Sequence, residues 1–141
     1  MAALFNTFAA DGVYRAPYVL QATLDETTGQ PVENLSHPRG WRVLPAQSAA
    51  LLRDMLVQVV QQGTAQDAAG LSGGAGGKTG TAQTGQFTPE GTERCNLWFA
   101  GFWPAEKPHY TIVVLQDGAV HTAYSGAAIF AQVCAALEAA G

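Results

Sequence analysis

The sequence has few charged residues and no basic cluster. Charged side chains make up 13% of its 141 residues, and the seven Lys and Arg residues are scattered along a chain of net charge −4. A surface that binds nucleic acid needs clustered cations to neutralise the phosphates. Nucleic acid is therefore not an expected partner.

Long hydrophobic runs are also missing. No apolar stretch approaches the roughly 20 residues that a membrane-spanning helix needs. Met1 leads directly into Ala-Ala-Leu-Phe-Asn, without the basic start of a signal peptide. We therefore expect neither a membrane segment nor an export signal within this chain.

Cysteine and histidine are too sparse for a metal framework. The two cysteines, Cys95 and Cys134, are far apart and are expected to be buried free thiols. The three histidines, His37, His109 and His121, show no recognisable ligand spacing. We expect no metal and no other cofactor.

What the sequence does contain is three segments with helical periodicity. They are residues 1–10, 47–62 and 124–140. The middle segment is the clearest, because Leu52, Met55, Leu56, Val59 and Val60 recur on one face, and Arg53 is expected to face water. Gly63 is positioned to end that helix.

Strand character marks four further segments. They are residues 16–24, 77–84, 95–103 and 109–116. The short link 104–108 forces the last two to run antiparallel, and the nearly continuous apolar run 110–115 predicts a strand covered on both faces. The element order predicts an α+β fold with a three-stranded antiparallel sheet, a C-terminal helix packed on it, and N-terminal helices.

One segment carries chemistry, Gly76-Gly77-Lys78-Thr79-Gly80-Thr81-Ala82. The stretch 72–79 nearly matches a phosphate-binding loop, but the opening glycine is replaced by Ser72 and the residues after Lys78 oppose the helix that such a loop must begin. A strand fits better. Its glycine would let a bound peptide approach the backbone closely. The alternative is an ordinary glycine-rich strand with one exposed lysine.

Lys78-Thr79-Gly80 resembles the third signature of the serine penicillin-recognising enzymes. The segments around it resemble, in the same order, those of the large penicillin-binding proteins. These segments are 9–12, 17–19, 55–65, 78–83 and 98–105. The likeness covers nearly the whole chain. It implies that residues 1–141 are the C-terminal portion of the transpeptidase domain of a class B-like high-molecular-weight penicillin-binding protein, an incomplete serine transpeptidase/β-lactamase-like fold.

The resemblance also implies roles for individual residues. Lys78 would assist proton transfer and carboxylate binding, and the backbone amide of Thr81 would belong to the oxyanion hole. Thr79, Gly80 and Thr81 would bind the substrate. The implied partners are peptidoglycan stem peptides and β-lactams, and the implied location of the parent is the outer face of the bacterial cytoplasmic membrane.

The nucleophile of that family is absent from these 141 residues. None of Ser36, Ser48, Ser72 and Ser125 is followed three positions later by lysine, and no Ser-x-Asn occurs. Without the serine no acyl-enzyme can form. We therefore expect a fragment of a peptidoglycan D,D-transpeptidase that is inactive alone. The alternative is a non-catalytic binding module or penicillin-sensor-like domain with the same fold.

A domain cut in this way should leave apolar surface in water. We take Leu97, Phe99, Ile112 and Val114 as candidates for that face. Exposed apolar surface favours self-association, so a homo-oligomer is expected.

Overall fold

The computed structural model describes residues 1–20, 22–34, 39–120 and 124–141. Ser36, His37, His121 and part of the segment 16–24, at position 21, lie outside the described residues. The helices are α1 (Ala2–Ala9), α2 (Ala46–Gln62), the 3-10 turn η1 (Gln66–Ala68) and α3 (Gly126–Ala140). The strands are β1 (Val13–Tyr14), β2 (Ala22–Leu24), β3 (Pro31–Asn34), β4 (Trp41–Arg42), β5 (Gly76–Phe87), β6 (Glu93–Trp103) and β7 (Tyr110–Ala119).

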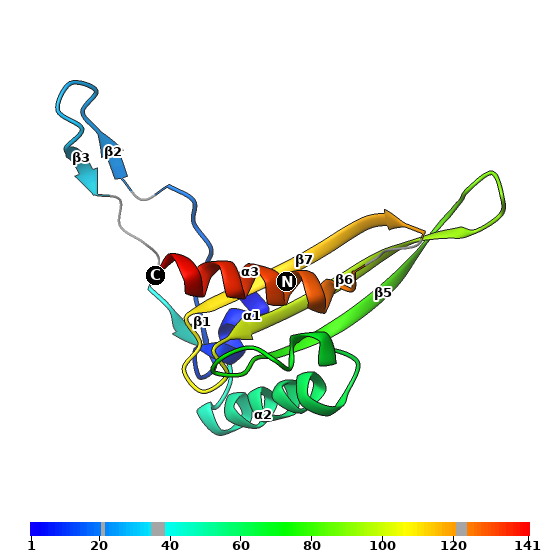
Figure 1. Cartoon of the computed structure of the whole chain (residues 1–141). Helices are drawn as coiled ribbons and strands as arrows, with labels where there is room; N and C mark the ends of the chain where they lie inside the picture. Colours follow the sequence, from blue (N-terminus) through cyan, green and yellow to red (C-terminus); the bar gives the residue numbers. More distant parts are fainter. Residues whose placement is uncertain (21, 35–38, 121–123) are drawn as a thin grey trace.

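The predicted α+β fold is confirmed. The last three strands form an antiparallel sheet in the order β5-β6-β7, and α3 lies across one face of it (Figure 1). The predicted strands were shorter than the observed ones because glycine and polar residues at their ends continue the pairing. The middle strand, β6, is the one that is buried on both faces, from Phe99 to Trp103.

The prediction that 110–115 is covered on both faces holds for the middle of the strand. There Ile112 and Val114 pack against the buried cluster that contains Phe130 of α3, and Val113 packs against the one that contains Phe5 of α1. β7 is an outer strand of the three-stranded sheet, and Tyr110 and Leu115 keep 43% and 45% of their surface exposed. An apolar run shows that side chains can be buried, but the neighbours available decide which of them are. Here the continuous burial belongs to β6, from Phe99 to Trp103.

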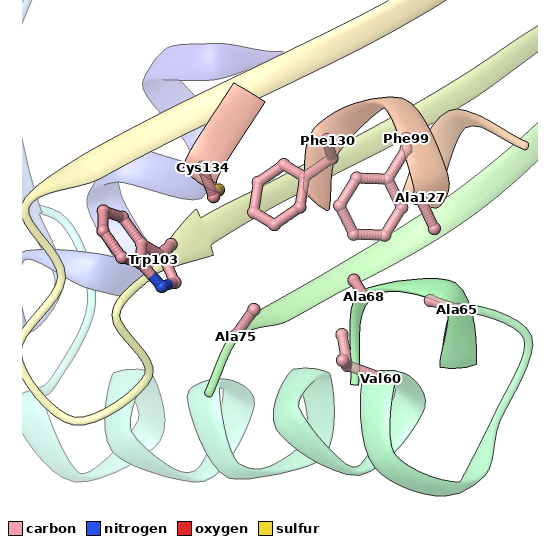
Figure 2. Close-up of a cluster of buried hydrophobic side chains, with 9 residues drawn as sticks. All are labelled: Val60, Ala65, Ala68, Ala75, Phe99, Trp103, Ala127, Phe130 and Cys134. Atoms are coloured by element: carbon pink, nitrogen blue, oxygen red, sulfur yellow. The ribbon is translucent and has the colours of Figure 1, made fainter. Parts of the chain in front are cut away.

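Alternate side chains of β6 enter two separate hydrophobic clusters. On one face Phe99 and Trp103 pack with Phe130 and Cys134 of α3 and with Val60 of α2, as Figure 2 shows. The rings of Phe99 and Phe130 lie 4.8 Å apart between centroids. On the other face Ala100 and Phe102 pack against Phe5 of α1. This alternation is what a strand with period 2 delivers, and it fixes the position of the sheet between the helices.

Helix α2 contributes to both clusters, so its inner face differs from the predicted one. Val60 belongs to the α3 side, whereas Leu56 and Val57 pack on the α1 side. Met55, predicted to be inside, is 54% exposed. Arg53, predicted to face water, instead donates to the carbonyl of Phe8 and pairs with the carboxylate of Asp11, and these contacts hold α1 against α2.

The N-terminal third is less regular than predicted. Residues 16–24 do not form one strand: β1 ends at Tyr14, β2 begins at Ala22, and Pro17 between them lacks an N–H donor. Instead β1 pairs with β4, and β2 pairs with β3 in a hairpin that stands away from the rest of the chain (Figure 1). A turn at residues 25–30 joins β2 to β3. There the backbone N–H and side-chain hydroxyl of Thr28, followed by the backbone N–H of Thr27, donate to Asp25 and lower the pKa of its carboxyl.

The apolar surface is not where we expected it. Phe99 is fully buried, Leu97 is half-buried, and Ile112 and Val114 pack against the α3 cluster, so these strand residues do not form an exposed face. Large exposed apolar side chains occur instead along α1, α2 and the segment of the β2–β3 hairpin. In that segment they are Tyr18, Val19, Leu20, Leu24 and Val32.

Candidate functional site

A hollow of about 310 Å³ opens where β5 passes the N-terminus of α3. It is lined by residues from three elements that are distant in sequence. They are Thr79, Gly80 and Thr81 of β5, Leu97 and Trp98 of β6, and Ser125 and Gly126 at the start of α3. The register of the sheet explains the first two walls, because Gly80 pairs with Trp98 and Thr81 with Leu97.

β5 passes from the core into this hollow within a few residues. Gly76 and Gly77 are buried, whereas Lys78 and Thr81 are exposed. A Cβ atom on Gly77 would lie 2.3 Å from Cζ of Phe99, so packing within the protein requires that glycine. A Cβ atom on Gly80 would meet nothing closer than Cβ of Trp98, at 3.6 Å, which is ordinary contact. Internal packing therefore requires glycine at position 77 but not at position 80, where Gly80 lines the hollow.

Three polar side chains are joined at one end of the hollow. The ammonium of Lys78 donates to the carbonyl oxygen of Thr79 at 3.0 Å and to its Oγ1 at 3.2 Å. The hydroxyl of Thr79 lies 2.8 Å from that of Thr64, in the turn after α2. Lys78 does not itself line the hollow, but these contacts place its charge next to Thr79.

The opposite wall is the N-terminus of α3. Ser125 caps this helix, since its Oγ accepts from the backbone N–H of Ala128 at 3.0 Å. The same hydroxyl donates to the carboxylate of Asp67 in η1. Gly126 is tightly packed here, because a Cβ atom would lie 3.0 Å from Cβ of Phe99 and 3.2 Å from its backbone nitrogen. The turn from Thr64 to Asp67 thus contacts both walls, through Thr79 on one side and Ser125 on the other.

A second hollow, of about 340 Å³, lies between α1, the segment 15–18 and β7. Its lining is mainly small or apolar and includes one cation, Arg15. It contains none of the residues that the sequence nominated. The chemistry that we predicted is therefore concentrated at β5, where a lysine, two threonines and an open glycine occur together.

The structure places the nominated residues as follows. Lys78, Thr79, Gly80 and Thr81 all lie on a strand, so a phosphate-binding loop is excluded by the absence of a helix start at Lys78. Thr79, Gly80 and Thr81 line one hollow. Sequence reasoning assigned no role to Thr64, Asp67 and Ser125. The only signal for Ser125 was its place before Gly126 and a helical period, which is typical of an N-cap.

Neither a metal centre nor a membrane span is evident in the described ranges. Across residues 1–20, 22–34, 39–120 and 124–141, no three His, Cys, Asp or Glu side chains are grouped so that they could hold a metal ion. Among the same residues, no helix has the length and apolar character that crossing a bilayer demands.

Comparison with protein families gives a match along almost the entire chain. A family model described as the transpeptidase domain of penicillin-binding proteins matches residues 1–136. Penicillin-binding protein PbpB of Mycolicibacterium smegmatis is 35% identical in an alignment of 132 positions that covers 83% of this chain and 19% of that protein. The chain thus spans about a fifth of the length of this relative.

Solved structures agree with the family match. Penicillin-binding protein 3 of Mycobacterium tuberculosis, in complex with ampicillin, is 32% identical and superposes with a TM-score of 0.77, covering 99% of this chain and 33% of that one. The D,D-transpeptidase domain of a peptidoglycan glycosyltransferase from Eggerthella lenta is 28% identical with a TM-score of 0.79, covering 99% of this chain and 31% of that one. The present fold therefore corresponds to about one third of each of these structures.

Proposed function

Since the chain belongs to the penicillin-binding protein transpeptidase family, we propose that it forms the C-terminal portion of a D,D-transpeptidase domain that crosslinks peptidoglycan stem peptides. The observation that carries this proposal is the arrangement of Lys78-Thr79-Gly80-Thr81. These residues lie on β5, which pairs only with β6 in the described part of the chain, and three of them line a hollow. An extended peptide can pair with an unpaired strand edge through its main chain.

Each of these four residues of β5 has a role that its position supports. The ammonium of Lys78 supplies positive charge for a substrate carboxylate and for proton transfer. The hydroxyls of Thr79 and Thr81 bind that carboxylate, and Gly80 admits the peptide backbone because its wall of the hollow is open. The amide of Thr81 is our candidate for one donor of the oxyanion hole, where charge develops in acyl transfer.

These 141 residues supply one side of the active site only. They contain no serine with a lysine three positions later, so no residue here can be activated as the family's nucleophile. We propose that the chain alone forms no acyl-enzyme and turns over no substrate. Its length relative to the solved relatives, about one third, agrees with a portion of a larger domain.

The same site is the candidate for β-lactam recognition. Penicillin-binding protein 3 of M. tuberculosis was solved with ampicillin and with aztreonam, both of which carry an anionic group. In this chain the carboxylate of a penicillin would meet the same hydroxyls as the carboxylate of a peptide. The place of action that follows is the outer face of the bacterial cytoplasmic membrane, where peptidoglycan is crosslinked.

A titration of the chain with a stem-peptide mimic tests the proposal. An acetylated tripeptide ending in D-alanyl-D-alanine should shift the backbone amide signals of residues 79–81 saturably in two-dimensional NMR spectra. The same tripeptide with L-alanines is the stereochemical control, and Thr81→Val should weaken the effect. Saturable shifts confined to the hollow beside Arg15, or none at any concentration, would refute the proposed site.

A further inference from the structure

The hydroxyl of Thr79 has fewer free positions than its exposure suggests. A threonine hydroxyl offers one proton and two acceptor sites. One acceptor site of Thr79 Oγ1 is taken by the ammonium of Lys78, at 3.2 Å. The hydroxyl of Thr64 lies 2.8 Å away and can act either as donor to Thr79 or as acceptor from it. The direction of this one bond decides what Thr79 presents to a ligand in the hollow.

The two directions have opposite consequences. If Thr64 donates, both acceptor sites of Thr79 are filled and its proton is left to donate into the hollow. If Thr64 accepts, the proton of Thr79 is used and a lone pair faces the ligand. A carboxylate needs a donor and is repelled by a lone pair, whereas a neutral amide group can use either. The first direction therefore favours an anionic ligand.

We propose that Thr64 is a positioning residue that makes Thr79 a hydrogen-bond donor to the ligand carboxylate. The relay is Thr64 Oγ1–H to Thr79 Oγ1, and Thr79 Oγ1–H to a carboxylate oxygen. This role of Thr64 rests on the proposed function, since it requires a ligand carboxylate in the hollow. It deepens that function by naming a residue outside β5 that selects for a negatively charged ligand.

The backbone holds Thr64 where this relay needs it. The amides of Gly63 and Ala65 both donate to the carbonyl of Val59, at 3.0 and 3.3 Å. Ala65 is fully buried, and a Cβ atom on Gly63 would lie 2.8 Å from that same carbonyl oxygen. The turn is therefore anchored on both sides of Thr64, while the side chain of Thr64 is exposed and carries little of the packing.

The test compares two ligands on three forms of the chain. The ligands are the acetylated tripeptide ending in D-alanyl-D-alanine and its C-terminal carboxamide. The forms are the wild-type chain, Thr64→Val, which keeps the shape and loses the hydroxyl, and Thr64→Ser, which keeps the hydroxyl. Thr23→Val, on the exposed β2–β3 hairpin, is the matched control for a threonine-to-valine change. Dissociation constants come from the amide shifts of residues 79–81.

We expect Thr64→Val to weaken carboxylate binding about three- to tenfold, the effect of one lost hydrogen bond of ordinary net strength. Binding of the carboxamide should change by less than about twofold, and Thr64→Ser should restore the wild-type preference. A purely structural role would weaken both ligands together. Equal losses for the two ligands, or a full preference for the carboxylate in Thr64→Val, would overturn the role of Thr64.

The same titrations distinguish a failure of the proposed function from a failure of the proposed role of Thr64. If the wild-type chain shows no saturable shift with either ligand, the proposed site itself is refuted, and the relay falls with it. If the wild-type chain prefers the carboxylate and Thr79→Val loses that preference while Thr64→Val keeps it, the site stands and only the relay is wrong. Amide spectra of the α3 cluster serve as the check that each variant is folded.

Discussion

Gly77 lies against the ring of Phe99, so closely that a Cβ atom on Gly77 would come within 2.3 Å of Phe99 Cζ and 2.8 Å of the carbonyl oxygen of Ala100. Three residues further along the same strand, Gly80 has no such neighbour. The two glycines thus occupy their positions in this strand for different physical reasons. One serves the internal packing, and the other leaves the hollow open.

This difference predicts opposite phenotypes for two alanine substitutions. Gly77→Ala should lower the free energy of unfolding by about 1–3 kcal/mol or more, because the backbone carbonyl that it meets cannot move aside as a flexible side chain could. Gly80→Ala should change it by less than about 1 kcal/mol but weaken binding of the D-alanyl-D-alanine peptide. Urea denaturation and NMR titration measure the two effects. A Gly80→Ala chain that binds normally would show that the hollow does not hold the peptide.

We predict that the chain forms no covalent adduct with a β-lactam. Incubation with excess benzylpenicillin followed by intact-mass spectrometry should leave the mass of the chain unchanged, because none of its serines has the lysine partner that would activate it. A full-length penicillin-binding protein is the positive control for the reagent. A stoichiometric mass gain that disappears when one serine is replaced would contradict the assignment of this chain as one side of the site.

The two thiols should react at very different rates. Cys134 is fully buried in the α3 cluster, and desolvation raises the pKa of its thiol from 9.0 to about 11, whereas Cys95 is half-buried. The thiolate is the reactive form. At pH 8 a disulfide reagent should modify one thiol per folded chain and two per unfolded chain. The fast reaction should be lost in Cys95→Ser and kept in Cys134→Ala.

The same thiol predicts a loss of stability in alkali. Since the folded pKa is raised, the unfolded chain releases this proton first, and the contribution of Cys134 declines as pH rises from about 9 through 11. The urea midpoint of the wild-type chain should therefore fall more steeply between pH 8.5 and 11 than that of Cys134→Ala. Parallel curves for the two chains would show that Cys134 titrates normally.

Self-association is expected through the segment 18–34 rather than through the sheet. Val19 is 105% exposed just before the projecting β2–β3 hairpin, and Val32 is 69% exposed on its strand β3. Light scattering at micromolar concentration should report a mass above the 14.7 kDa of one chain. The double variant Val19→Ser, Val32→Thr should shift the mass towards the monomer, whereas Leu51→Ser, an exposed apolar position on α2, should not. A monodisperse wild-type monomer would refute this prediction.

The regular part of the fold was accessible from sequence because its signals are local. A period of 3.6 residues around Leu56 and a period of 2 around Phe99 are properties of short windows. What failed depended on neighbours distant in the chain. Met55 and Arg53 exchanged their expected environments because α2 packs on two clusters, and Arg53 meets Asp11, which is 42 residues away.

The residues of the candidate site likewise divide into those that the sequence predicts and those that it does not. Lys78 to Thr81 could be found because the four residues are contiguous and the strand that carries them is continuous. Thr64 and Asp67 could not, since their contacts with Thr79 and Ser125 join residues 15 and 58 positions apart. No periodicity or propensity encodes such contacts, which exist only after the turn, the strand and the helix have come together.

Among the described residues, the strands of the three-stranded sheet pair only in chain order, β5 with β6 and β6 with β7, across the short links 88–92 and 104–109. Closing short loops costs little entropy, and contacts between near neighbours are made early in folding. The strand carrying Lys78 therefore belongs to a unit that can assemble from residues 76–119 before the distant N-terminal hairpin finds its place. A growing chain would acquire this wall of the site within a single stretch of synthesis. The amides of β6, which pairs with a strand on each side, should be among the last to exchange with solvent when the rest has opened.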